Sequence, residues 1–318
     1  MNKTIKFPRL RNLASEDAET RRLALAKLNG TDHDLIQAAD ILPLLVDEEI
    51  QTRLLAIHLL AELNDVAAIP ALLDTTLDSD DEIADAARVA LLEFRTRDAV
   101  EPFITGVGHS SPEAREAAVV SLRELRSPRA IPALRRALED PAAAVRREAV
   151  LTLARVPDPG VPAILVSSFE DPDEEVRRRA VAAVGTFRQE GTLPLLLRSL
   201  RDKDWSVRRE GAAALAHFRN PDAIAALRRA LRDENPLVTR EAIASLGKLR
   251  APEGAKLAEF LNHDLAYVRI ATAKALGEIG DPIFRFRLSM LLDDRNPDVV
   301  KTVLHALGRL DEKELRAA

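Results

Sequence analysis

One arginine position recurs in four consecutive segments of the chain, and its chemistry suits anion binding. The arginines lie 31 residues apart, at Arg147, Arg178, Arg209 and Arg240. A guanidinium group presents a planar set of donors that matches carboxylates and phosphates. Further basic side chains lie eight residues after three of these arginines, at Arg155, His217 and Lys248. If the segments fold alike, these groups form one surface for an anionic or acidic partner.

A second interpretation of the same arginines is structural. Acidic residues follow three of them directly, at Glu148, Glu210 and Glu241, so the guanidinium groups could be solvated or paired locally. The flanking position favours a binding role, because it is acidic in earlier segments, at Glu62, Glu93 and Glu124. Residues 1–100 hold 11 Lys and Arg against 19 Asp and Glu, a net charge of −8, whereas the remainder carries +3. A change of sign along one face bears on how a partner is oriented.

The cysteine, histidine and acidic residues of the sequence do not form a pattern typical of a catalytic or metal-binding site. The chain has no cysteine, and its six histidines include no His-x-x-x-His pair and no His-Glu dipeptide. The acidic stretches 78–82 and 171–175 fall in expected turns and lack the ligand spacing of a calcium loop. No glycine-rich phosphate loop is present. We therefore expect no catalytic residue, no metal and no cofactor.

The single tryptophan, Trp205, falls at the expected start of a helix near the rim of the basic surface. An exposed tryptophan is a frequent contact hot spot. The alternative is that Trp205 only packs locally.

A helix-pair unit of about 31 residues positions all of these side chains. It is tracked by one apolar position whose spacing is 30 to 32 residues: Leu28, Leu60, Leu91, Leu122, Leu153, Val184, Leu215, Leu246, Leu276 and Leu307. A fixed period of this size is typical of stacked repeat arrays. In such an array the second helix of each pair usually lines the concave side.

One repeat illustrates the unit. Residues 131–140 predict a first helix and its exit, with Pro132 near the helix start. Asp140 and Pro141 predict the N-cap and first position of the second helix. That helix carries one apolar stripe, formed by Val145, Ala149, Leu153 and Val156.

The fold expected is all-α, a right-handed superhelical solenoid of about ten antiparallel helix pairs. We expect one solenoid over residues 1–318, with an abbreviated N-terminal repeat or cap over 1–30 and a polar C-terminal tail over 311–318. The last repeat then offers a bare edge that could support weak self-association. Coverage of that edge by the polar tail is the alternative.

Pairs of Asp and Arg six residues apart carry a family resemblance. They are Asp140 and Arg146, Asp171 and Arg177, and Asp202 and Arg208. The pattern Asp-Pro-x-x-x-Val-Arg-x-x-Ala-x-x-x-Leu resembles HEAT-like repeats of the short form associated with phycobilisome lyases. The resemblance implies a structural Asp–Arg ladder between neighbouring loops. It is best over 129–250, and Thr239, His263 and Val300 depart from it.

The resemblance leaves two functional classes open. The first is a non-catalytic protein-binding scaffold or assembly adaptor. The second is a subunit similar to phycobilin lyases, in which the arginines would hold the propionates of an open-chain tetrapyrrole. HEAT-like di-iron hydroxylases carry His-Glu pairs, which this sequence lacks.

The composition bears on the class of partner and on the cellular compartment of the protein. A pI of about 5.8 and 3% aromatic residues disfavour nucleic-acid binding, which stays a third alternative. No stretch has the roughly 18 apolar residues of a membrane span, and no secretory signal is seen at the start. We expect a cytoplasmic protein that binds other proteins and not membranes.

Overall fold

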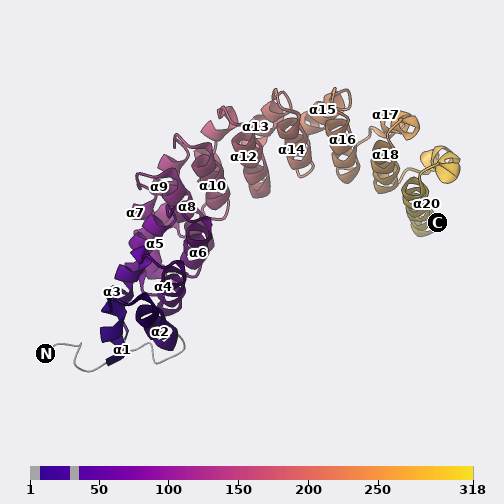
Figure 1. The fold of residues 1–318 in the computed structure, drawn as a ribbon. Coiled ribbons are helices and arrows are strands. Elements are labelled where there is room, and N and C mark those ends of the chain that lie inside the picture. Colours follow the sequence, from indigo (N-terminus) through magenta and orange to yellow (C-terminus); the bar gives the residue numbers. More distant parts are fainter. Residues whose placement is uncertain (1–7, 29–35, 318) are drawn as a thin grey trace. The chain divides into compact units, whose positions relative to one another are not determined.

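The computed structural model describes residues 8–28 and 36–317, and within these ranges every regular element is helical. The chain forms two compact units, Met1–Val161 and Pro162–Ala318. In each unit, helices stack as repeated pairs of a shorter first helix and a longer second helix (Figure 1). This is the architecture of an all-α solenoid, as the 31-residue period predicts. The hand of the superhelix and the assignment of residues 1–318 to one solenoid stay predictions.

The second helices of the first unit pack side by side in sequence order. They are α2 (Ala18–Leu28), α4 (Ile50–Leu63), α6 (Asp81–Leu91), α8 (Pro112–Leu125) and α10 (Ala143–Leu153). Short α and 3-10 helices form the first-helix layer: α1 (Pro8–Arg11), η2 (Asn12–Ala14), α3 (Ala38–Ile41), η4 (Leu42–Val46), η5 (Val66–Ala68), α5 (Ile69–Thr75), η6 (Arg97–Ala99), α7 (Val100–Gly106), η7 (Pro128–Ala130) and α9 (Ile131–Ala137).

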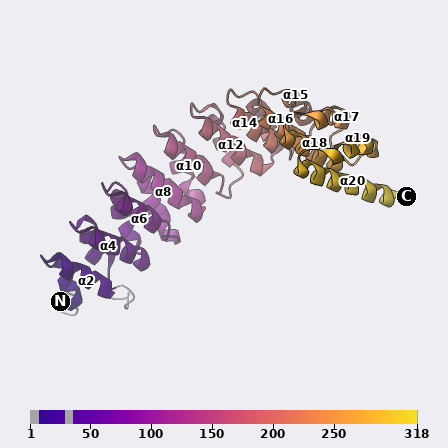
Figure 2. The same cartoon turned by 45° about the vertical axis from the view of Figure 1, so that its right-hand side comes forward.

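The second unit repeats this arrangement, and Figure 2 shows its helices from another side. Its second helices are α12 (Glu174–Phe187), α14 (Trp205–Leu215), α16 (Pro236–Lys248), α18 (Ala266–Ile279) and α20 (Pro297–Ala317). Its first-helix layer holds α11 (Val161–Ile164), η8 (Ser167–Glu170), η9 (Glu190–Thr192), α13 (Leu193–Ser199), α15 (Pro221–Ala230), α17 (Gly254–Leu257), η10 (Ala258–Asn262), η11 (Pro282–Phe284), α19 (Arg285–Ser289) and η12 (Met290–Asp293). Because α20 runs to Ala317, the expected polar tail is helical over 311–317.

The apolar stripe of each second helix forms the core. Val145, Ala149 and Leu153 have no exposed surface, which confirms the stripe predicted for that helix. The Leu153 position is buried in the other described repeats up to Leu276, whereas in the last repeat Leu310 is fully buried and Leu307 only partly. Small residues allow the close approach of neighbours. A Cβ atom on Gly247 would lie 2.6 Å from the Cα of Ala275, so α16 and α18 pack nearly backbone to backbone.

The second helix begins two residues later than the sequence predicts. The N-cap of α10 is Ala142, and Asp140 accepts the backbone N–H of Ala142 at 2.9 Å. The prediction that Asp140 caps this helix was therefore wrong. In other repeats the residue two positions after the equivalent of Asp140 caps the helix with its side chain: Asp80, Ser111, Asp173, Asp204 and Asn235. Asp140 is left free to bond across the loops.

A double repeat is superimposed on the 31-residue period. From α4 to α16, left-handed backbone conformations follow alternate second helices at 62-residue intervals, at Asn64, Arg126, Arg188 and Arg250; Gly280 after α18 ends this alternation. The helices before them, α4, α8, α12 and α16, have 13 or 14 residues. The intervening α6, α10 and α14 have 11 residues and end in the right-handed conformation. Alternate repeats thus leave the second helix by different routes.

Arg126 has φ 47° and is a non-glycine residue in a conformation that glycine adopts without steric cost. We expect Arg126→Gly to stabilise the protein by about 1 kcal/mol, because glycine is the preferred residue at such helix ends. Thermal unfolding followed by circular dichroism measures the effect. Gly280→Ala, at φ 71°, is the matched opposite and should lower the melting temperature. A lower melting temperature for Arg126→Gly would contradict this account.

Candidate partner-binding face

Neighbouring repeats are joined by an arginine–aspartate bridge between their loops. Arg177 donates from Nε and Nη2 to the two carboxylate oxygens of Asp202, at 2.8 and 2.9 Å. Its Nη1 donates to the backbone carbonyl of Asp171 in its own repeat, at 2.8 Å. The side chains of Arg177 and Asp202 are 5% and 11% exposed, so the pair is largely shielded from water. One guanidinium group therefore ties its own loop to the next loop along the stack.

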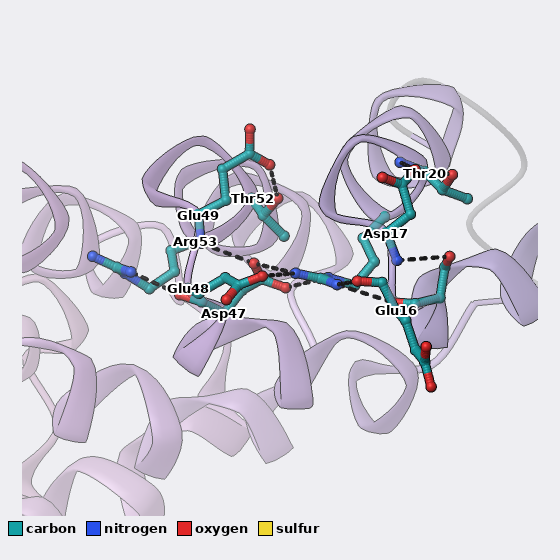
Figure 3. A network of polar contacts seen from close by, with 10 residues as sticks. Glu16, Asp17, Thr20, Asp47, Glu48, Glu49, Thr52 and Arg53 are labelled. Carbon is teal, nitrogen blue, oxygen red and sulfur yellow. Dashed lines mark hydrogen bonds and ion pairs between the residues drawn. The ribbon is translucent and has the colours of Figure 1, made fainter.

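The same bridge recurs through both units, always between residues 25 or 26 apart. The pairs are Arg21 and Asp47, Arg53 and Asp78, Arg115 and Asp140, Arg177 and Asp202, Arg208 and Asp233, and Arg269 and Asp294. Figure 3 shows the surroundings of Asp47, whose backbone carbonyl accepts from Arg53 at 2.7 Å. Asp47 also accepts the backbone N–H of Glu49 at 3.0 Å. Each aspartate thus fixes the turn before its helix and holds the preceding repeat.

Where the arginine is missing, the aspartate of the next repeat is missing too. Ala84 occupies the arginine position of α6, and His109 replaces the following aspartate. The Nδ1 atom of His109 accepts the backbone N–H of Ser111 at 3.1 Å, which is the bond that an aspartate makes elsewhere. Thr239 and His263 form the second such pair, and His263 accepts from the Leu265 N–H. Because a shielded carboxylate without its cation is costly, the two positions change together.

The bridges lower the pKa of the aspartates. The hydrogen bonds from Arg21 hold the pKa of the Asp47 carboxyl below its usual value, against the opposing effect of burial. Burial raises the pKa of Asp233, but the hydrogen bonds from Arg208 and from a backbone N–H outweigh it, and the net shift is downward. The pKa values of two further bridge aspartates are also lowered, those of Asp140 and Asp294. These carboxylates are therefore charged at neutral pH.

The candidate binding residues divide between the two units. Arg147 lies in α10 and is half-buried, and Arg155 follows the end of that helix and is exposed. The second unit holds the other candidates, Trp205, His217 and Lys248 together with three arginines at the same position of successive helices: Arg178 in α12, Arg209 in α14 and Arg240 in α16. Because α12, α14 and α16 pack in order, these residues share the second-helix face of this unit.

Carboxylates neutralise two of the three arginines unequally. Arg178 donates to both oxygens of Glu175 at 2.7 Å, and its Nη1 lies 3.6 Å from Glu210 of the next helix. The hydrogen bonds from Arg178 and Arg179 hold the pKa of Glu175 at about 2, against the opposing effect of burial. Arg240 has a looser contact, 3.7 Å from Glu241. Arg178 and Arg240 are therefore partly neutralised by carboxylates of the protein itself, as expected if these arginines have a structural role.

Arg209 differs from the other two arginines of this row because no carboxylate neutralises it within the described residues. It makes no ion pair within the described residues, and its Cζ lies 5.7 Å from the ring centroid of Trp205. A guanidinium group at this distance gains a cation–π attraction and keeps its donors available. Trp205 itself is 37% exposed. Trp205 and Arg209 thus present a flat aromatic surface beside a positive charge that no carboxylate neutralises within the described residues.

A second basic group gathers at the C-terminal ends of these helices. Burial lowers the pKa of His217, and the nearby charges of Arg188 and Lys248 lower it further. His217 is therefore neutral at pH 7 and contributes donors and acceptors, not charge. The sequence analysis missed Arg188 because this residue follows the end of α12 and is not one of the helix positions compared between repeats. Arginine recurs at this position every 62 residues, at Arg126, Arg188 and Arg250, and this recurrence is the signal that could have identified it.

Two further observations bear on other kinds of site. Within the described residues, no three His, Asp or Glu side chains are grouped to hold a metal ion, and no helix has the length and apolar character needed to cross a membrane. The first-helix side of the last repeat exposes large apolar side chains: Ile283, Phe286 and Met290. Weak self-association through the C-terminal edge, expected at the last second helix, stays a prediction.

The fold and the loop bridges define an all-α repeat protein with a long second-helix face. A family model described as HEAT repeats matches residues 78–143, 98–185, 136–213, 163–247, 194–264 and 254–318. The chain belongs to the HEAT-repeat family. No curated protein matches its sequence.

Solved structures share the fold at low identity. An engineered protein is 21% identical with a TM-score of 0.51, over 98% of this chain and 99% of that one. YibA of E. coli is 20% identical with a TM-score of 0.52, over 93% of this chain and 98% of that one. Kap95 in its complex with Nup1 is 15% identical with a TM-score of 0.65. That match covers 95% of this chain and 48% of Kap95, so the chain spans about half of the Kap95 length.

The coupling of the two bridge positions is testable by substitution. We expect Arg177→Thr alone to destabilise the protein by about 2–3 kcal/mol, because Asp202 keeps a shielded charge without its partner. The double variant Arg177→Thr/Asp202→His recreates the natural pair of Thr239 and His263. It should lose less stability than the sum of the two single variants. Denaturant unfolding measures this, and strictly additive losses would contradict the coupling.

The lowered pKa values predict sensitivity to acid. A folded-state pKa below the unfolded value of about 3.9 stabilises the protein above that pH, and the stabilisation is lost as the pH falls through the folded-state pKa. We expect the free energy of unfolding to change little from pH 7 to about pH 5 and to fall steeply below about pH 4. Asp233→Asn should be destabilised at pH 7 and should approach the wild type at low pH. An unchanged difference between the two proteins at pH 2.5 would contradict the assignment.

Proposed function

We propose that this protein is a non-catalytic, cytoplasmic scaffold or assembly adaptor that binds a protein partner with an acidic surface. The binding face is the second-helix side of residues 162–318, centred on Arg209, Trp205 and Arg240. The observation that carries the proposal is the state of Arg209. It is held over an aromatic ring without a carboxylate partner, whereas the bridge arginines Arg177 and Arg208 are each paired with an aspartate.

The face combines the features of a protein-contact surface. Trp205 offers apolar area with little conformational freedom to lose, and Trp and Arg are the residues most enriched in interface hot spots. Small residues from successive helices form a shallow floor between the charged positions: Ala182, Ala213 and Ala244. A shallow floor of small side chains can contact a folded protein surface or a helix. It does not enclose a small ligand as a deep pocket does.

The structural neighbours support the protein-binding class without naming a partner. Kap95 has been solved with Nup1 and with RanGDP, so solenoids of this fold hold other proteins. For this chain, the acidic character of the partner rests on the charges of its own face. Arg147 and Arg155 lie in the first unit and are therefore treated as a separate candidate group.

A tetrapyrrole-binding subunit is the second candidate. Two propionates could be held by Arg209 and Arg240, which lie on adjacent helices. The test is the absorbance of an added bilin, which shifts when the chromophore is bound and straightened. An absorbance shift with no retained protein partner would replace the scaffold proposal.

Trp205 is the single tryptophan, so intrinsic fluorescence reports on this face directly. We expect titration with a poly-glutamate peptide at low ionic strength to change the Trp205 emission. Arg209→Glu/Arg240→Glu should weaken binding at least tenfold, because two attractive charges become repulsive, while circular dichroism stays unchanged. Arg178 is kept intact, because its reversal would face Glu175 and Glu210 inside the protein.

The control carries the same change of net charge elsewhere in the unit. Arg201 and Arg232 are exposed in the loops, away from the second-helix face, and Arg201→Glu/Arg232→Glu should bind like the wild type. The same three proteins then serve as baits for lysate, with and without nuclease. Equal weakening by both double variants would show a non-specific charge effect. Capture that depends on nuclease treatment would favour nucleic acid instead.

A further inference from the structure

In the first unit, the repeats of α4, α6 and α8 carry acidic side chains at positions where the repeats of α14 and α16 carry basic ones. A cleft of about 650 Å³ opens between α4 and α6. Its floor includes Ile57, Ala61 and Ala86, together with Val89, which is 61% exposed. Glu62 and Glu93 stand at one rim of this cleft. An exposed valine between carboxylates is an apolar contact point inside a negative field.

The pattern continues onto α8 because the helices share one register. The floor position is held by His58, Val89 and Val120 in α4, α6 and α8. Four residues later in each repeat comes a glutamate: Glu62 in α4, Glu93 just after the end of α6, and Glu124 in α8. Four residues before the floor, α6 and α8 carry Asp85 and Glu116. These positions form a strip that is apolar on α6 and α8, where it lies between two acidic rows, and we call this surface the acidic groove.

Most carboxylates of the groove are not engaged inside the protein. Glu93, Glu116 and Glu124 make no ion pair within the described residues, and Glu93 and Glu124 are exposed. Asp85 contacts Arg88 of its own helix. The bridge aspartates Asp47, Asp78 and Asp140 of the same unit, by contrast, are each paired with an arginine. The groove therefore carries a net negative charge, and Glu93, Glu116 and Glu124 stabilise no ion pair within the described residues.

The dimensions of the groove suit an α-helix. Its two acidic rows lie eight residues apart in the repeats of α6 and α8, which is about 12 Å at 1.5 Å per residue. A helix with its side chains is about 10–12 Å across. Packed helices lie about 8–10 Å apart, and seven residues of a bound helix advance about 10.5 Å. One apolar residue in every seven would therefore meet the floor positions of successive helices.

Extended ligands fit this geometry less well. A strand advances about 10 Å in three residues, but its side chains alternate, so residues three apart point to opposite faces. A polyproline helix keeps one face toward the floor, yet it is too narrow to reach both acidic rows at once. Only an amphipathic helix with basic residues on both sides of an apolar stripe uses the floor and both rows.

We propose that the acidic groove, centred on Val89, Glu93 and Glu124, binds a cationic amphipathic helix of a protein partner. This site lies in the first unit and differs from the basic face of the proposed function in location and in charge. The protein then carries two docking surfaces of opposite sign. Each has its own variants, so failure of one proposal leaves the other intact.

The test uses a labelled 21-residue model helix with leucine on one face and lysine on both flanks of that face. Fluorescence anisotropy with the full-length protein at about 50 mM salt measures its affinity. Glu93→Lys/Glu124→Lys should weaken binding at least tenfold, and raising the salt should weaken wild-type binding, because the attraction is electrostatic. Val89→Ser should weaken it several-fold without a change in charge.

Matched controls separate the groove from net charge. Asp98 and Glu139 are exposed outside the groove in the same unit, and Asp98→Lys/Glu139→Lys should bind like the wild type. A scrambled peptide of the same composition tests amphipathicity, and a leucine–glutamate helix tests the sign of the charge. Circular dichroism confirms that each variant is folded.

Three results would overturn the proposal. The first is equal weakening by the groove variant and the control variant. The second is equally tight binding of the scrambled peptide, which would reduce the interaction to charge alone. The third is an affinity that does not change in Glu93→Lys/Glu124→Lys or in Val89→Ser.

Discussion

The bridge between an arginine and the aspartate of the next repeat is the interaction on which the rest of the structure depends. Each guanidinium group bonds two backbone or side-chain acceptors in different loops, as Arg177 does with Asp171 and Asp202. Where it is present, the bridge holds consecutive loops together, and the stacking of the second helices sets the register of the side chains on their exposed face. The bridges lie in the loops, so they do not constrain the charge of the side chains on the exposed helix faces. The basic and acidic surfaces of the two units are consequences of that freedom.

The fold was predictable because its signal is redundant. Ten apolar positions at 30 to 32 residues determine the helix-pair unit, and one substitution changes little. The start of the second helix was misplaced because Asp140 followed by proline has the chemistry of a cap, while Asp140 bonds Arg115 across the loops. The sequence shows Asp and Arg six residues apart, but the side chains that pair are 25 apart, as at Arg115 and Asp140. A short-range pattern thus concealed a contact between repeats.

The candidate face was predictable in position but not in electrostatic state. Register alone places Arg178, Arg209 and Arg240 on successive helices, and it treats them as equivalent. They differ because of their neighbours: Arg178 is held by two glutamates, whereas Arg209 lies over Trp205. Pairing of this kind depends on side-chain rotamers at contacts between helices, which periodicity does not encode. The acidic groove was visible in the sequence only as a change of sign, and its apolar floor required the exposure of Val89.

The central claim is that the helix faces bind partners while the loop bridges only hold the stack together. Hydrogen exchange of the full-length protein, alone and with a captured acidic partner, tests it most directly. The account predicts that protection on binding concentrates in α14 and α16, around Arg209 and Arg240, while the loops around Asp202 and Asp233 exchange as before. Protection confined to those loops, with α14 and α16 unchanged, would contradict the account.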